Sequence, residues 1–143
     1  MAKVKFSYAD VSAITLKNKT RVKQFIEEIF YEERKDLDAL QYVFCSDEYL
    51  LKINQSFLQH NYYTDIVTFD LSENGKGTTG EVYISIDRVR DNAIVHQAHF
   101  QNELLRVIFH GSLHLCGYKD KKKSEITLMR DKEEYYLRLF ENK

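Results

Sequence analysis

Two histidines four residues apart, His110 and His114, are the side chains in this sequence whose spacing most directly suggests chemistry. Residues at positions i and i+4 of a helix lie one turn apart on the same face, so two imidazoles can hold one ion between them. An ordinary surface or core pair of histidines has the same spacing. The apolar neighbours on both sides and the residues that follow favour the metal interpretation.

The residues after His114 predict a third ligand. Gly117 suits the left-handed turn that ends a helix, and the chain then reverses direction. Asp120 follows this reversal and is placed to swing back toward the imidazoles as an oxygen ligand. Three protein ligands leave an open position for water, which is typical of catalytic metal sites. The sequence therefore predicts one divalent metal ion, with zinc as the expected ion, held by His110, His114 and Asp120.

The sequence indicates no general base for this site. Gly111 follows the first histidine, so the glutamate that serves in HExxH peptidases is missing and a peptidase is disfavoured. The catalytic group that we expect is therefore a metal-bound water. Two further histidines, His96 and His99, are three residues apart in polar surroundings, and we expect them on an exposed helix turn away from the metal.

Residues 107–120 resemble the signature of the YbeY family of metal-dependent endoribonucleases, which ends in H-G-x-L-H-L-x-G-Y-D-H. The matching positions are His110, Gly111, Leu113, His114, Leu115, Gly117 and Tyr118. The last two family residues fall on Lys119 and Asp120, so an aspartate stands where the family has its third histidine ligand. A carboxylate is a competent ligand for zinc and for harder divalent ions, so the site with Asp120 can accept either kind of ion.

A second stretch, residues 53–69, is similar to the family's L-N-x-x-Y-R-x-x-D-x-P-T-D-V-L-S-F. Asn54, Phe57, Thr64, Asp65 and Phe69 agree in type. The family's arginine, implicated in RNA cleavage, falls on Leu58, and its proline falls on Tyr63. Losing the arginine removes a planar, permanently charged donor suited to phosphate.

The resemblance spans roughly residues 40–140 and implies a function. It implies an endoribonuclease selective for single-stranded RNA in ribosomal RNA maturation, with ribosomal RNA and a ribosomal subunit as partners. A metal-activated water would attack the phosphodiester. Two alternatives stay open: a non-catalytic ribosome- or RNA-associated factor whose metal only braces the loop after Gly117, and a metal-dependent hydrolase of another substrate.

A basic cluster beside the predicted metal site is the natural contact for RNA. Lys121, Lys122 and Lys123 follow Asp120 directly, and we predict that they bind phosphate, although a solvated loop would have the same composition. The formal net charge of the chain is −1, so the molecule as a whole does not attract a polyanion. Binding of RNA must then depend on such a local patch.

Hydrophobic periodicity predicts the elements that position these residues. We expect strands at Val4–Tyr8, Ala39–Cys45, 65–70 and 79–86, and helices at 20–34, from 46, at 88–96, at 100–116 and from 124, capped by Thr20, Ser46, Asp87 and Ser124. This order describes an α+β domain, a mixed sheet of about four strands with helices mainly on one face. The early strands should be parallel and the last pair antiparallel. The metal site should lie at the end of a central helix.

Composition bounds the remaining expectations. With 143 residues that are 43% hydrophobic, the chain should form one domain, residues 1–143, around a single core. Cys45 and Cys116 are too few for a disulfide framework and should be reduced core residues. The sequence opens with no apolar leader and contains no apolar run of membrane-spanning length, so we expect a cytoplasmic protein without a membrane partner.

Overall fold

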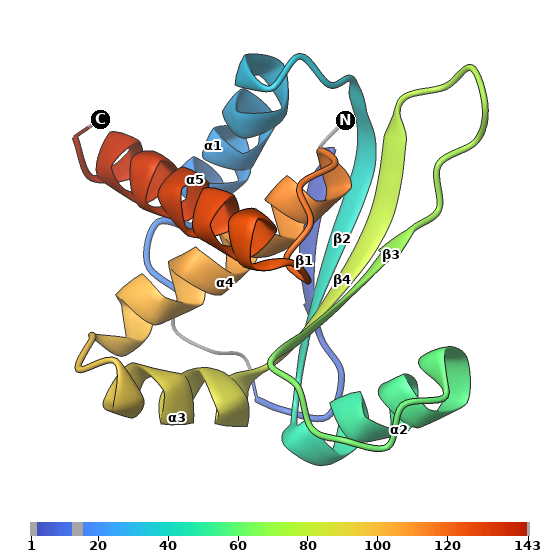
Figure 1. The fold of residues 1–143 in the computed structure, drawn as a ribbon, viewed down its shortest axis with the longest axis vertical. Helices are drawn as coiled ribbons and strands as arrows, with labels where there is room; N and C mark the ends of the chain where they lie inside the picture. Colours follow the sequence, from blue (N-terminus) through green and yellow to red (C-terminus); the bar gives the residue numbers. More distant parts are fainter. Residues whose placement is uncertain (1–2, 13–15, 143) are drawn as a thin grey trace.

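A four-stranded sheet with helices on both sides organises the computed structural model, which describes residues 3–12 and 16–142 (Figure 1). The elements in chain order are β1 (Val4–Tyr8), α1 (Lys19–Glu32), β2 (Leu37–Cys45), α2 (Asp47–Leu58), β3 (Ile66–Asp70), β4 (Thr78–Ser85), α3 (Ile86–Val95), α4 (Phe100–Leu115) and α5 (Lys123–Glu141). The predicted α+β class and order of elements are confirmed.

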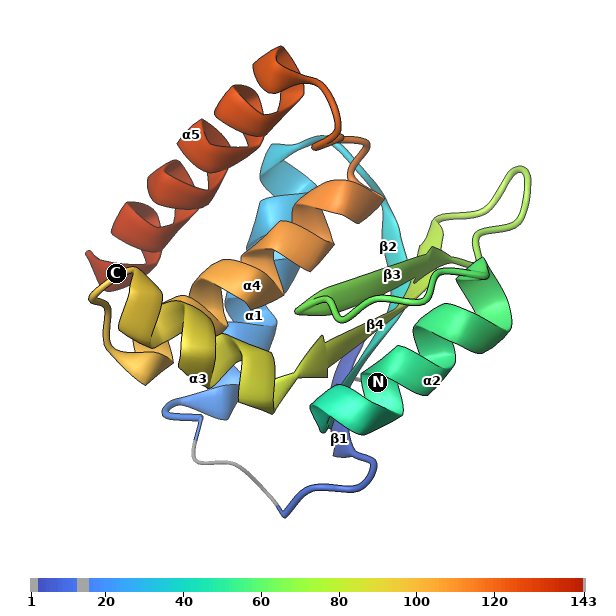
Figure 2. The ribbon, with the colours of Figure 1, turned by 60° about the horizontal axis from the view of Figure 1, so that its bottom comes forward.

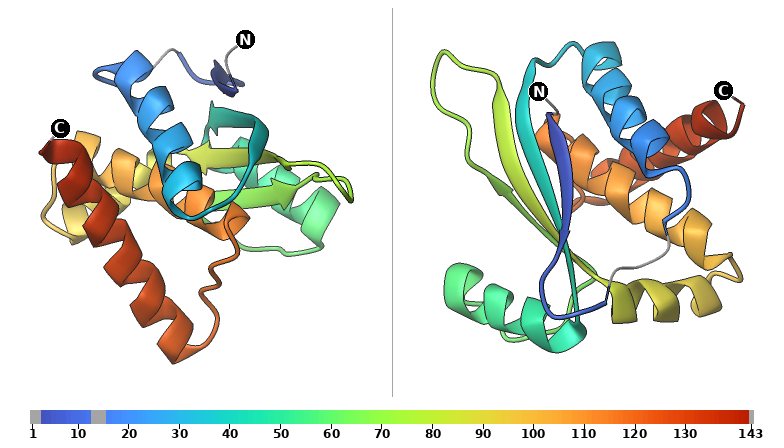
Figure 3. Two further views of the ribbon diagram at one scale, coloured as in Figure 1. Left: turned by 90° about the horizontal axis from the view of Figure 1, so that it is seen from above. Right: turned by 180° about the vertical axis from the view of Figure 1, so that it is seen from behind.

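The sheet is mixed, as predicted. Its strand order is β1-β2-β4-β3, in which β2 pairs in parallel with both β1 and β4. The edge strand β3 runs antiparallel to β4, so Val67 lies opposite Tyr83. The connection between β3 and β4 contains Gly75 and Gly77, and it projects beyond the end of the sheet (Figure 3). This order places β3 at the edge beside the cleft that is described below.

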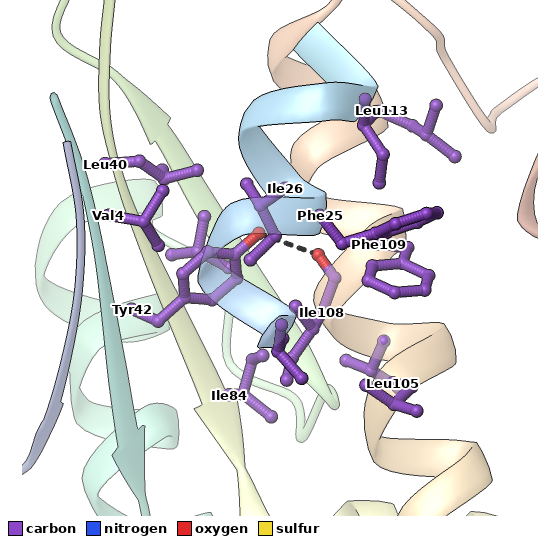
Figure 4. Packing of buried hydrophobic residues seen from close by; sticks show 14 of the residues in the cluster. Val4, Phe25, Ile26, Leu40, Tyr42, Ile84, Leu105, Ile108, Phe109 and Leu113 are labelled. Atoms are coloured by element: carbon purple, nitrogen blue, oxygen red, sulfur yellow. Dashed lines mark hydrogen bonds between the residues drawn. The ribbon is translucent and has the colours of Figure 1, made fainter. Parts of the chain in front are cut away.

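Helices α1, α4 and α5 gather on one face of the sheet, and α2 lies on the other (Figure 2). The side chains of α4 that face the sheet and α1, including Leu104, Ile108 and Phe109, are essentially inaccessible to solvent. Tyr42 on β2 donates a 2.8 Å hydrogen bond from its hydroxyl to the Ile108 carbonyl, which ties the sheet to α4 (Figure 4). The predicted central helix is therefore confirmed.

A glycine brings α4 close to the sheet beside the first histidine. A Cβ at Gly111 would lie 2.9 Å from Cγ1 of Val82 and 3.1 Å from Cδ1 of Ile66. Distances this short are tighter than van der Waals packing permits, so a larger residue would push the helix outward. The absence of a side chain at 111 thus holds His110 near the start of β3.

Three of the predicted helix caps are wrong, and one is confirmed. Ser46 caps α2 as expected, since its side chain accepts a hydrogen bond from the Tyr49 amide. Helix α1 begins after Asn18, and Thr20 lies inside it. Ser85 caps α3 in place of Asp87, whose carboxylate instead accepts from the first amide of α2. Helix α5 begins after Lys122, so Ser124 lies within its first turn.

Two large apolar side chains on the helices are exposed, although the helical periodicity of the apolar residues would place them inward. Phe57 on α2 is 67% exposed, and its ring lies 6.0 Å, centroid to centroid, from that of Phe69. Ile126 on α5 is 42% exposed, whereas Met129, Tyr136 and Phe140 face the core as expected. In the part of the chain that the structure describes, no helix has the length and apolarity that crossing a bilayer requires.

Candidate metal centre

Helix α4 carries both histidines into one open cleft. The side chains of His110 and His114 are 15% and 26% exposed, and their rings lie edge to face with centroids 4.5 Å apart. Most other residues of this helix from Glu103 to Leu115 are buried in the core, whereas both histidines reach solvent. The backbone of a rigid, buried helix therefore fixes the distance between the two imidazoles.

The chain reverses after α4 and returns a carboxylate to the histidines. Gly117 adopts a φ of 107°, the left-handed conformation that its position predicts. The amide of Tyr118 donates to the Leu113 carbonyl at 3.0 Å, which closes the turn. Oδ2 of Asp120 then lies 3.2 Å from Nε2 of His110 and 3.2 Å from Nε2 of His114. The ligand atoms of the three residues all lie within 4.8 Å of one another.

Nδ1, the ring nitrogen of each histidine that lies away from Asp120, already has a hydrogen-bond partner. Nδ1 of His110 lies 2.5 Å from Oε2 of Glu133, and Nδ1 of His114 lies 2.9 Å from the Tyr118 carbonyl oxygen. A histidine that donates its Nδ1 proton to an oxygen presents an unprotonated Nε2 to a metal ion. Both Nε2 atoms point toward Asp120. The donor set thus fits one divalent ion that accepts nitrogen and oxygen ligands.

Behind the histidines lies a buried ionic network. Glu103 and Glu133 are each 2% exposed, and Arg106 bridges them, with Nε 3.1 Å from both oxygens of Glu103 and a terminal nitrogen 3.0 Å from Glu133. Burial tends to raise the pKa of Glu133, but the hydrogen bond from His110 and the charge of Arg106 hold that pKa below its usual range. Glu133 is therefore an ionised acceptor for the imidazole.

The reversal after α4 is tied to the far end of α1. The Tyr118 hydroxyl donates to Oε1 of Glu33 at 2.7 Å, and Nζ of Lys132 lies 3.2 Å from the other oxygen. The Tyr136 hydroxyl donates to the same carboxylate. These contacts hold Tyr118, whose carbonyl orients His114. The metal group is thus supported by Glu33 at the end of α1 and by two residues of α5.

The metal group opens into a cleft of about 740 Å³ whose lining comes from α2, β3, α3, α4, α5 and the connections between them. Among the described residues that line it, the acidic side chains are Asp65, Asp70, Asp120 and Glu133, and the basic ones are Arg106, Lys121 and Arg130. Acids outnumber bases, and both carboxylates near Arg106 already offset its charge. A bound divalent cation would reverse the sign of this balance and make the cleft suitable for phosphate.

The other residues singled out from the sequence fall into two groups. Lys121 lines the cleft, whereas Lys122 and Lys123 lie outside its lining, at the start of α5. Leu58 lines the cleft and is 38% exposed. His96 and His99 lie outside the metal group, since His96 contacts Glu103 at 3.3 Å and His99 is an exposed residue before α4.

Sequence reasoning missed Glu133, Arg106 and Arg130. Glu133 shares the buried stripe of α5 with Met129, Tyr136 and Phe140, and a carboxylate among core positions was the available signal. Arg106 lies three residues from Glu103 and four before His110, on the same face of α4. Arg130 is an exposed residue beside Met129, and nothing in its local sequence distinguishes it from other surface arginines.

The fold is a mixed sheet packed against helices. Its site is a pair of histidines on α4 and a carboxylate from the turn that follows, and all three line one cleft. Together these features define a metal-dependent hydrolase. Comparison with known proteins agrees. A family model described as Endoribonuclease YbeY matches residues 5–141. This chain belongs to the YbeY endoribonuclease family.

Individual relatives cover nearly the whole chain. An endoribonuclease YbeY from Cytophaga hutchinsonii is 44% identical over 134 residues, which are 94% of each chain. Its counterpart from Porphyromonas gingivalis is 45% identical over 134 residues, covering 94% of this chain and 87% of that protein. A Thermotoga maritima protein known from its solution structure is 27% identical and superposes with a TM-score of 0.65, covering 96% of this chain and 88% of that one.

Proposed function

We propose that this chain is a metal-dependent endoribonuclease that cuts single-stranded RNA during ribosomal RNA maturation. The observation that carries the proposal is the convergence of His110, His114 and Asp120 at the floor of a cleft large enough for nucleotides, in a chain of the YbeY family. The activity and the role in ribosomal RNA maturation come from the family. A ribosomal subunit is the expected setting for the reaction.

In this proposal His110 and His114 hold the ion through Nε2 and Asp120 holds it through a carboxylate oxygen. A divalent ion such as zinc supplies an activated water and offsets charge on phosphate oxygens. Glu133 keeps the His110 proton on Nδ1, and the Tyr118 carbonyl does the same for His114. The protein's contribution is thus to fix the protonation and orientation of both imidazoles before substrate arrives.

The substrate contacts follow from the lining of the cleft. Lys121 and Arg130 are exposed cations on the α5 side, and we assign them to phosphates near the scissile bond. Lys122 and Lys123 extend the same cationic stretch outside the cleft and are assigned to more distant phosphates. A cytoplasmic location is part of the proposal, and the two buried free thiols, Cys45 and Cys116, accord with a reducing compartment.

A second candidate function is a non-catalytic RNA-associated factor in which the metal only braces the turn at Gly117. It is favoured by Leu58, which lies in the cleft at the position of the family's arginine and carries no charge. Cleavage of a labelled single strand and of the same sequence in a duplex, by the purified full chain with and without chelator, separates the two. We expect cut single strand that chelator abolishes and added zinc restores.

The variant His114→Ala supplies the control for that assay. It removes one ligand from an exposed stripe of α4 and leaves the core side chains in place. The endoribonuclease proposal requires this variant to bind RNA with little cleavage. RNA binding without cleavage by the zinc-loaded wild type would support the second candidate instead.

A further inference from the structure

Two exposed aromatic rings line the cleft, on a different segment of the chain from the basic residues Lys121 and Arg130. His60 and Tyr62, on the connection between α2 and β3, are stacked with ring centroids 5.1 Å apart and planes 18° apart. Tyr62 is 57% exposed, His60 is exposed as well, and both line the cleft that contains the metal group. Two stacked rings, each with a flat π surface, therefore border the space where substrate would lie.

The backbone beneath these rings is held in place by α2. Gln59 ends the helix in a left-handed conformation, and the amide of His60 donates to the Asn54 carbonyl at 3.1 Å. Asn54 is 1% exposed, and its side-chain amide donates to the Tyr62 carbonyl at 3.0 Å. The Tyr62 hydroxyl also lies 3.1 Å from Nδ1 of His60. The stacked pair is thus formed before any ligand binds, which reduces the entropy lost on binding.

The cleft combines two kinds of lining that call for different chemistry from one occupant. Its lining combines two cations, Lys121 and Arg130, with the metal group and the two stacked rings. An apolar protein segment would cover the rings but leave the cations without partners. A nucleotide matches both, since its base has a π face and its phosphate is anionic. In this chain the rings lie two and four residues after Leu58, where the family places an arginine.

We propose that His60 and Tyr62 form a stacking platform for one unpaired base of the RNA strand whose phosphate lies at His110, His114 and Asp120. This inference rests on the proposed function, because it identifies how the same cleft holds its substrate. A base inside a duplex is stacked and paired and so has no free face to offer. The platform therefore selects single strands, and it tolerates any base because every base has a π face.

The test is a cycle that changes the ring and the base separately and together. The zinc-loaded full chain is mixed with a labelled single-stranded oligoribonucleotide, and affinity is read from fluorescence anisotropy before appreciable cleavage. A series of oligonucleotides places one abasic site at each successive position. We expect Tyr62→Leu to weaken binding of the intact strand about tenfold and the abasic site at one position to weaken wild-type binding about tenfold. Tyr62→Leu with that abasic strand should still show about tenfold loss, because the same interaction is removed twice.

Two variants control for a merely structural effect. Tyr62→Phe keeps the ring but loses the hydroxyl that contacts His60, and it should recover most of the affinity that Tyr62→Leu loses. Tyr63→Leu changes a neighbouring exposed tyrosine that does not line the cleft and whose hydroxyl donates to Glu48, and it should leave affinity unchanged. A strand with 2-aminopurine at the sensitive position should lose fluorescence on binding to wild type and not on binding to Tyr62→Leu.

If the affinity losses from Tyr62→Leu and from the abasic site multiply to about a hundredfold, the platform is refuted. An unchanged affinity in Tyr62→Leu would refute it as well. Cleavage assayed in parallel keeps the two proposals apart. Cleaved RNA without coupling leaves the endoribonuclease proposal intact and refutes the platform. Coupling between Tyr62 and the base, without cleavage by the zinc-loaded chain, supports the platform and refutes the endoribonuclease proposal. A wild-type chain that neither binds nor cuts RNA refutes both.

Discussion

The imidazole of His110 and the carboxylate of Glu133 are joined by a hydrogen bond of 2.5 Å between Nδ1 and Oε2. The carboxylate is buried, is held ionised beside Arg106, and reaches the histidine from a different helix. An ionised carboxylate accepts the Nδ1 proton, which leaves the lone pair of Nε2 for a metal ion. The metal group therefore depends on the docking of α5 against α4.

This relationship predicts the effect of Glu133→Gln on metal binding. Glutamine fills the same volume and can keep its oxygen toward Arg106, but it then turns an NH₂ donor toward His110. The imidazole must accept at Nδ1 and carry its proton on Nε2, where the proton opposes the metal. We expect zinc affinity, measured calorimetrically on metal-free protein, to fall about 10- to 100-fold. Glu134→Gln, on the exposed side of α5, is the matched control, and equal affinities of the two variants would contradict the role of Glu133.

Asp120 supplies the second prediction, because its carboxylate is equidistant from both Nε2 atoms. Asp120→Ala should reduce the zinc content of purified protein, and Asp120→His, which restores the family's residue, should recover it. The nitrogen ligand should also shift preference away from harder ions such as manganese. Elemental analysis after equal exposure to mixed metals checks both points. Asp131→Ala, an exposed acid of α5, controls for the change in net charge, and full metal content in Asp120→Ala would remove Asp120 from the ligand set.

Glu33 carries a prediction about pH and stability. Burial tends to raise its pKa, but hydrogen bonds from Tyr118, Tyr136 and Lys132 hold that pKa below the usual range. A depressed pKa in the folded state means that the unfolded chain binds the proton more tightly. The stabilisation is thus complete above the ordinary glutamate pKa of about 4.3 and is lost as pH falls through the lower folded value.

Glu33→Gln should consequently lower the free energy of unfolding by roughly 2 kcal/mol at neutral pH, the scale of a hydrogen bond to a charged group. The difference from wild type should shrink as the pH is lowered below about 4. Urea denaturation of both proteins across this range measures it. Glu32→Gln, an adjacent residue whose side chain accepts from the exposed Tyr135, is the control. A difference that stays constant with pH would mean that the charge of Glu33 does not stabilise the fold.

Local sequence predicts the floor of the site because its parts are close along the chain. His110 and His114 share one helix, and Gly117 ends that helix in the way its lack of a side chain allows, which returns Asp120 to the histidines. The order of strands and helices followed from periodicity in the same way. These features depend on backbone geometry over a few residues, which sequence patterns describe well.

The rest of the site depends on packing between distant segments. Glu133 reaches His110 only because α5 folds back over α4, and no pattern within α5 specifies that angle. Three of the predicted helix caps were wrong for a related reason. Ser85 and Asp87 are both suitable cap residues, and the strand pairing of β4, which runs to Ser85, decides between them. Phe57 fits the apolar periodicity of α2 but is exposed, because α2 contributes no core at its last turn.

The lysines after Asp120 carry the fourth prediction. Changing Lys121, Lys122 and Lys123 together to Gln should weaken RNA binding across sequences, since phosphate contacts carry no sequence information. The slope of log affinity against log salt should decrease by about 0.7 for each phosphate of a single strand that the variant no longer neutralises. Because Lys121 lines the cleft, Lys121→Gln alone should account for part of the weakening, whereas Lys52→Gln on α2 should cause none. An unchanged salt slope in the triple variant would identify the cluster as an ordinary solvated loop.

The last prediction concerns Leu58, which lines the cleft at the position of the family's arginine. Cleavage by this chain should depend on the ion but proceed slowly, because no charge at 58 opposes the negative charge that develops on the phosphate. One such donor commonly contributes about 3 kcal/mol to transition-state stabilisation, which corresponds to roughly a hundredfold in rate. Leu58→Arg should therefore raise the rate of RNA cleavage by up to that factor.

Initial rates on one single-stranded RNA, at saturating zinc, measure the change. Leu58→Gln is the matched control, since it adds a polar side chain to the same half-exposed position without adding a permanent charge. The double variant Leu58→Arg with His114→Ala should be inactive, because the arginine stabilises charge but supplies no nucleophile. Cleavage that persists in metal-stripped His114→Ala protein would place the activity outside this site. Equal rates for the Arg and Gln variants would mean that a charge at position 58 does not reach the reacting phosphate.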